Sequence, residues 1–140
     1  MERVVPEAVT AVEPLATPRV ELRIPADSAY VSMLRTATAG LAARLDFTLD
    51  DIDDLRMAVD EACGLLLPQA IPGSELNAVF ALGADELRIS VTATSAAPHL
   101  PDRDGFAWVV LSAVAGAVEA STGPDGDVTL SIVRKRRASP

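Results

Sequence analysis

The chain has 140 residues, of which 49% are hydrophobic and 23% are charged, and these proportions are typical of one folded soluble domain. Its formal net charge of −8 argues against bulk electrostatic binding to DNA or to an anionic membrane, where phosphates would repel it. The same charge permits a basic protein partner.

The single cysteine, Cys63, excludes an internal disulfide and a zinc cluster built from cysteines. A nucleophilic pair with the one histidine, His99, is the alternative, but Cys63 falls on the apolar side of a predicted helix, where a core thiol is expected. The sequence shows no secretion signal and no stretch as long as a membrane span. With a free thiol, these features predict a cytoplasmic protein.

Residues 1–18 contain three prolines and no clean hydrophobic period, so we expect a loose N-terminal arm. The segment 20–24 alternates apolar and polar side chains, which predicts a half-buried strand. A helix is expected over 28–45, with Asp27 or Ser28 as its N-cap. Its core-facing residues would be Val31, Leu34, Leu41 and Leu45.

A second helix is expected after Thr48, because Thr48 to Asp51 forms a capping-box pattern with an acid at the third helical position. Further acids in the first turns suit the positive end of the helix dipole. Pro68 cannot continue the helix without the loss of a backbone hydrogen bond, so the helix should end near Leu67. The expected buried stripe is Ile52, Leu55, Val59, Ala62, Cys63 and Leu66.

Two strands should follow, over 78–82 and 87–94, joined by a short turn at 83–85. Residues 95–105 contain prolines and aspartates and are typical of a loop. Residues 106–120 predict a third helix, and its expected inward residues are Leu111, Val114 and Val118.

After a turn at 123–126, the alternation of residues 128–132 predicts a last strand with Val128, Leu130 and Ile132 on one face. The basic run 134–137 is expected to be a solvated tail rather than a nucleic-acid site. The element order favours an α+β two-layer sandwich, in which about three helices cover one face of a mainly antiparallel mixed sheet.

The segment from Leu45 to Ala70 resembles the approach to the N-box, and the N-box itself, of the anti-sigma serine kinases in the GHKL (Bergerat-type) superfamily. The family N-box runs Glu-Ala-x-x-Asn-Ala-x-x-His-Ala, and here the Glu is Glu61, the Asn is replaced by Leu65 and the His by Gln69. The resemblance covers residues 19–135 as one GHKL-like anti-sigma domain. The arm 1–18 and a basic tail 136–140 lie outside it.

Helical spacing places positions 58, 61, 65 and 69 on one face, away from the main apolar stripe. The resemblance implies that this face looks into a nucleotide pocket, where Glu61 would be the catalytic acid or base. Leu65 has no oxygen for Mg²⁺, which demands oxygen ligands. Leu65 therefore fills a closed pocket, meets a partner or packs beneath a neighbouring loop, and Glu61 is either catalytic or a solvated helix acid.

The other two ATP motifs of the family have also lost residues. The Asp-x-Gly-x-Gly motif corresponds to Thr94 to Pro98, which holds neither the aspartate nor the glycines. The Gly-Leu-Gly-Leu motif retains Gly105 alone, and a phosphate cradle needs several exposed backbone N–H groups. We therefore expect no cofactor and no metal, with ATP and magnesium as the alternative.

The resemblance implies an anti-sigma factor that sequesters an alternative sigma factor and is antagonised by a STAS-type anti-anti-sigma factor. An ungapped count places Arg35 where the family has a docking arginine, whose guanidinium can pair with a partner carboxylate. An ordinary surface arginine is the other interpretation. A homodimer is also implied. The alternative function is an active serine kinase that phosphorylates its STAS antagonist through a divergent ATP site.

Overall fold

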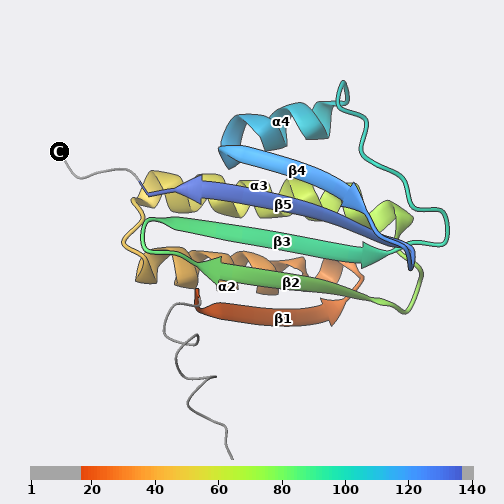
Figure 1. The fold of residues 1–140 in the computed structure, drawn as a ribbon, viewed down its shortest axis with the longest axis horizontal. Helices are drawn as coiled ribbons and strands as arrows, with labels where there is room; N and C mark the ends of the chain where they lie inside the picture. Colours follow the sequence, from red (N-terminus) through yellow and green to blue (C-terminus); the bar gives the residue numbers. More distant parts are fainter. Residues whose placement is uncertain (1–16, 137–140) are drawn as a thin grey trace, which may run out of the picture.

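The structure is a computed structural model that describes residues 17–136. Residues 1–16 of the predicted arm 1–18 and residues 137–140 of the predicted tail 136–140 lie outside the described residues. The elements, shown in Figure 1, are β1 (Arg19–Pro25), η2 (Ser28–Tyr30), α2 (Val31–Arg44), α3 (Leu49–Leu66), η3 (Leu67–Gln69), β2 (Glu75–Leu82), β3 (Glu86–Thr94), α4 (Phe106–Ala115), β4 (Ala117–Thr122) and β5 (Asp127–Lys135).

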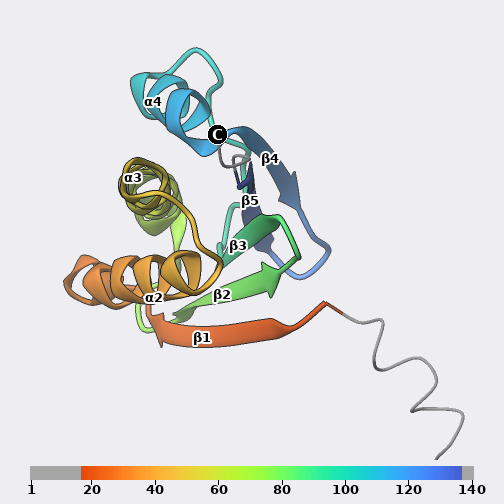
Figure 2. The same ribbon diagram turned by 90° about the vertical axis from the view of Figure 1, so that its left-hand side faces the viewer.

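The strands form one five-stranded sheet in the order β1-β2-β3-β5-β4. All neighbouring strands pair antiparallel, so the sheet is not mixed. The helices α2, α3 and α4 cover one face of the sheet, and α3 lies between the other two (Figure 2). The predicted α+β two-layer architecture is confirmed.

Thr48 caps α3 as the sequence predicts, whereas the predicted cap Asp27 starts the short helix η2, which leads into α2. The Asp27 carboxylate accepts a hydrogen bond from the backbone N–H of Ala29 at 2.9 Å, and the Thr48 hydroxyl accepts one from the N–H of Asp51 at 3.1 Å. Each contact satisfies a backbone donor that has no partner within the helix. All six residues of the predicted α3 stripe are buried. In α2, Val31 and Leu34 are buried, while Leu41 and Leu45 pack at the edge of the core.

The structure corrects the predicted third helix, because residues 117–122 form strand β4 and α4 ends at Ala115. Gly116 has φ 89° and ψ −83°, a conformation that stops the helix and that a residue with a side chain rarely adopts. A Cβ on Gly116 would also lie 2.8 Å from the Val133 carbonyl oxygen. Beyond this glycine, Val118 pairs with Ile132 of β5. A mostly apolar run does not distinguish a helix from a short strand, and Gly116 was the signal that the prediction missed.

The basic run at the C-terminal end is also corrected. Arg134 lies within β5, and its guanidinium donates to Asp51 at 2.8 Å, to Asp54 at 3.3 Å and to the Val114 carbonyl oxygen at 2.6 Å. The Asp51 side chain is 0% exposed and that of Arg134 is 12% exposed. Arg134 therefore ties β5 to the start of α3 and the end of α4, and it is no part of a solvated tail.

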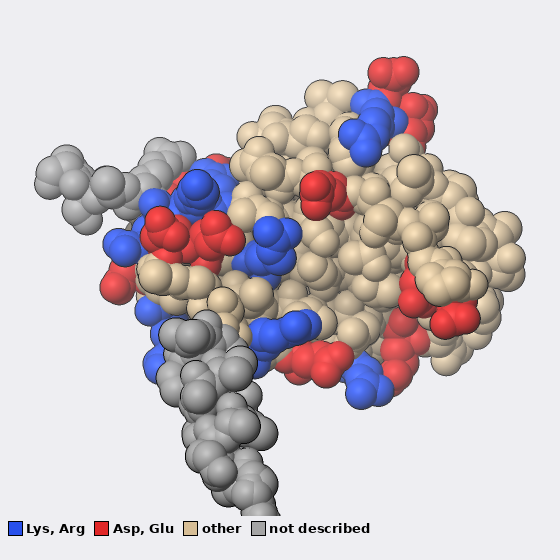
Figure 3. Space-filling model, in the orientation of Figure 1, with Lys and Arg blue, Asp and Glu red and all other residues tan. Residues whose placement is uncertain are grey.

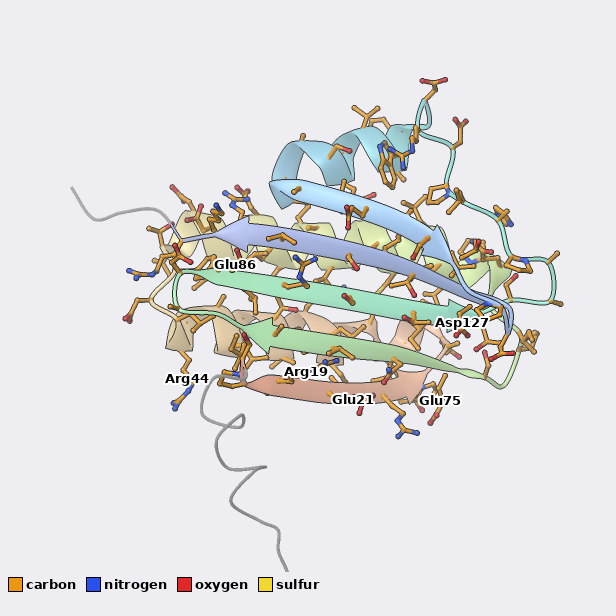
Figure 4. All side chains as sticks on the ribbon, in the orientation of Figure 1. Arg19, Glu21, Arg44, Glu75, Glu86 and Asp127 are labelled. Atoms are coloured by element: carbon orange, nitrogen blue, oxygen red, sulfur yellow. The ribbon has the colours of Figure 1, made fainter. Side chains whose placement is uncertain are left out.

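The sheet face opposite the helices is polar and carries small side chains. Two cross-strand hydroxyl pairs lie on it, Ser90 with Ser131 at 3.0 Å and Thr92 with Thr129 at 2.8 Å. Uncharged side chains cover much of the face in the space-filling view (Figure 3). The charged residues labelled on the strands lie on β1 or near strand ends: Arg19, Glu21, Glu75, Glu86 and Asp127 (Figure 4). Apolar and polar side chains alternate along the strands, so only the face toward the helices is buried.

We predict that Arg134→Met destabilises the fold by about 3–5 kcal/mol, because it leaves the buried Asp51 carboxylate without its charge partner. Urea unfolding followed by circular dichroism measures the change. Lys135→Met is the matched control, since Lys135 is exposed on the next position of the same strand. A loss below about 1 kcal/mol for Arg134→Met would show that the pair does not hold the layers together.

The thiol of Cys63 should be chemically inert in the folded protein. Burial, and secondarily the negative charge of Asp60, raises the pKa of Cys63 from 9.0 to about 12. The thiolate fraction at pH 8 then falls about 1,000-fold, so labelling by a disulfide reagent should be slower by at least that factor than in guanidinium chloride. Equal labelling rates in the two states would contradict the buried position.

Candidate functional site

A groove of about 400 Å³ lies between the start of α2 and the second half of α3. Charged residues, apolar residues and a glycine line this groove. Its lining residues are Ser28, Val31, Arg35, Asp60, Glu61, Cys63, Gly64 and Leu67. Two of the predicted site residues, Arg35 and Glu61, therefore lie in the same groove, which the sequence analysis did not foresee.

Arg35 is paired within the chain. Its Nη1 donates to the Asp60 Oδ1 at 2.6 Å, and the two side chains are 36% and 50% exposed. Solvent screens an ion pair this exposed, so its contribution to stability is small. Its effect is local, because it neutralises one of the two acids in the groove and orients the guanidinium across it.

Glu61, the retained N-box acid, faces this groove. Its carboxylate makes no hydrogen bond or ion pair with any side chain or backbone group of residues 17–136. Helical spacing is the reason that Asp60, Glu61 and Gly64 lie together at the outer side of α3, since residues three and four apart share a face. Asp60, which pairs with Arg35, was not among the residues predicted for the site. Gly64 was not among them either, although the same helical spacing places it on this face.

The predicted shared face of positions 58, 61, 65 and 69 is wrong at Ala58, which is 0% exposed and belongs to the core. The helix α3 is covered on three sides, by the sheet, by α2 and by α4 (Figure 2). A prediction from one apolar stripe identifies only one buried side of a helix, whereas α3 is covered on three. Leu65 is half-buried and packs against the hydrophobic core.

Gln69 holds the loop that follows β3. Its side-chain amide donates from Nε2 to the His99 carbonyl oxygen at 3.0 Å, and its Oε1 accepts from the His99 N–H at 3.1 Å. Ser95, at the start of the loop, forms an isolated bridge with Ala70. The loop is therefore attached to the end of α3 and η3 at both points. The contact between Gln69 and His99 joins residues thirty positions apart, so no local sequence pattern predicts it.

Gly105 has a structural role at the start of α4. It is the N-cap residue with φ −74° and ψ 155°, and its N–H donates to the Asp102 carbonyl oxygen at 3.0 Å. A Cβ there would lie 3.1 Å from the same oxygen, so the tight turn accounts for the glycine. Its backbone is not left-handed, and Gly105 does not line the groove that contains Glu61.

Among residues 17–136, no three His, Cys, Asp or Glu side chains are grouped so that they could hold a metal ion. Over the same part of the chain, no helix has both the length and the apolar character needed to cross a membrane. The groove between α2 and α3 thus combines charged and apolar side chains.

No family model matches the chain. It is 39% identical over 75 residues to the serine-protein kinase RsbW of Bacillus cereus, a match that covers 52% of this chain and 47% of that protein. The RsbW of Bacillus mycoides is 37% identical over 75 residues, with the same coverage. The chain spans about half the length of the curated relatives it matches.

The fold has a counterpart among solved structures. The crystal structure of the RsbU and RsbW domains of a Mycobacterium tuberculosis protein superposes with a TM-score of 0.67 at 17% identity, covering 86% of this chain and 32% of that one. Identity this low shows the fold alone, whereas the Bacillus proteins share sequence over about half of the chain. The chain is therefore similar in sequence to the RsbW serine-protein kinases over about half of its length, and it has the GHKL-like fold of the RsbU–RsbW structure.

Proposed function

We propose that the chain is an anti-sigma factor that sequesters an alternative sigma factor in the cytoplasm by protein–protein binding. A STAS-type anti-anti-sigma factor releases the sigma factor, and nucleotide binding and kinase activity are lost. The observation that carries the proposal is the structural use of the N-box positions: Leu65 packs against the core, and Gln69 holds the loop at His99.

The lost activity follows from the chemistry of the retained residues. Phosphoryl transfer depends on positioned phosphates and on metal ions that neutralise developing charge. At the position of the magnesium ligand, Leu65 offers no oxygen. Glu61 is left in a groove beside Arg35 and Asp60, and Gly105 caps α4 instead of forming part of a glycine-rich cradle.

Binding to a sigma factor requires only a surface, and the chain retains one. Arg35 and Glu61 lie in the groove between α2 and α3, and Leu65 is half-buried on the same helix. The net charge of −8 favours a partner with positive patches and speeds the encounter with it. We propose that the functional unit is a homodimer that binds neither nucleic acid nor membrane directly.

The second candidate function is an active serine kinase that phosphorylates its STAS antagonist. It is favoured by the retained Glu61 and by the serine-protein kinase names of the Bacillus relatives. The two functions differ in whether magnesium and ATP bind the folded chain.

We predict that magnesium with 1 mM ATP leaves the melting temperature unchanged. A ligand that binds only the folded state with a Kd of about 10 μM would add about 2.7 kcal/mol at that concentration and raise the melting point clearly. A nucleotide-binding RsbW protein is the positive control. A clear rise that Glu61→Ala reduces would restore the kinase to first place.

We also predict that one alternative sigma factor of the source organism forms a stable complex with the purified chain. Each candidate sigma factor is mixed with the chain and analysed by size-exclusion chromatography with light scattering, which also gives the oligomeric state. Addition of the cognate STAS protein should displace the sigma factor without ATP. If no sigma factor of the organism is retained, the proposed function is wrong.

A further inference from the structure

Gly64 is placed where a glycine weakens the fold. It lies in the interior of α3, where glycine is a poor helix former compared with alanine. A Cβ built on Gly64 would meet no atom within 4 Å, and its backbone is not left-handed. No contact within residues 17–136 therefore requires a glycine there. The missing side chain leaves open space where the exposed Gly64 lines the groove between α2 and α3.

The charge of this open space is negative. Asp60 is paired with Arg35 at 2.6 Å, whereas the Glu61 carboxylate has no partner among the described residues. The half-buried Leu67 adds apolar surface to the groove, whereas Val31, which also lines it, is only 5% exposed. A side chain that complements both features has an aliphatic stem and a positively charged head, which is the chemistry of arginine and lysine.

We propose that the groove receives a basic side chain of the protein partner, with its methylene groups over Gly64 and its charged head paired with Glu61. The inference rests on the proposed partner-binding function and deepens it. It assigns Glu61 a docking role, since a charge-assisted hydrogen bond to a basic head would satisfy the carboxylate that the fold leaves unpaired. Arg35 stays paired with Asp60, so Glu61 is the acid of the groove that is left to bind the cation.

The site is tested first without any partner, with n-butylguanidinium as a probe for an arginine side chain. In a titration followed by ¹H–¹⁵N NMR, we expect saturable shifts at the amides of Glu61, Gly64 and Leu67, with a Kd on the order of 10 mM for so small a cation. Butyrate, which has the opposite charge, should give none. Glu61→Gln should abolish the guanidinium shifts and keep the rest of the spectrum. Absence of saturable shifts in the wild-type chain would overturn the proposal.

Gly64→Leu and Gly40→Leu form a matched pair of variants. Both replace a helical glycine whose added Cβ would meet nothing within 4 Å, and only Gly64 lines the groove. Both variants should melt at or above the wild-type temperature, because leucine is a better helix former than glycine. Only Gly64→Leu should block the probe. Equal probe binding by the two variants would overturn the proposal.

The same variants separate this inference from the proposed function. If the wild-type chain retains a sigma factor, Gly64→Leu and Glu61→Gln should each weaken the complex at least 10-fold, and Gly40→Leu should not. Retention of the sigma factor by all variants alike would overturn the groove as the docking site and leave the anti-sigma function intact. Probe binding without retention of any sigma factor would support the groove as a site for basic side chains and overturn the anti-sigma function.

Discussion

The buried ion pair between Arg134 and Asp51 determines how the layers of this protein fit together. A carboxylate that is 0% exposed must be compensated, and the guanidinium of β5 does so while it also binds Asp54 and the last turn of α4. The pair sets the rotation of α3, because Asp51 must face the sheet and α4. Asp60 follows nine residues, or about two and a half turns, later and so faces the opposite way, toward α2. The orientation of α3 that buries Asp51 is thus the same one that places Asp60 in the charged groove.

The residues at the ATP-motif positions have structural roles that do not need a ligand. Leu65 adds to the packing of the core, Gln69 attaches the loop at His99, and Gly105 caps α4. In the proposed function, competition between binding partners releases the sigma factor, and phosphate transfer does not. Glu61 is the exception, because its part-exposed carboxylate has no hydrogen bond or ion pair within residues 17–136.

Local patterns predicted most of the fold. Alternation over residues 87–94 places the same side chains in the core as the structure does, since a strand turns successive side chains to opposite faces. The cap at Thr48 and the stripe of α3 were also predicted, because both depend on neighbours within one or two turns. Of the site, Arg35 and Glu61 could be selected as candidates by resemblance, but their shared groove could not, because it requires the packing of two helices.

The sequence by itself determined the fold class and the order of the long helices and of all strands but β4, because each depends on residue type and short spacing. Only the tertiary structure decided that residues 117–122 extend the sheet, that Arg134 pairs with the buried Asp51 and that Ala58 belongs to the core. The same holds for the Arg35–Asp60 pair and the Gln69–His99 contact. Each of these features depends on contacts between positions far apart in the chain. Burial and the compensation of buried charge decide which distant groups meet, and a local sequence pattern contains neither.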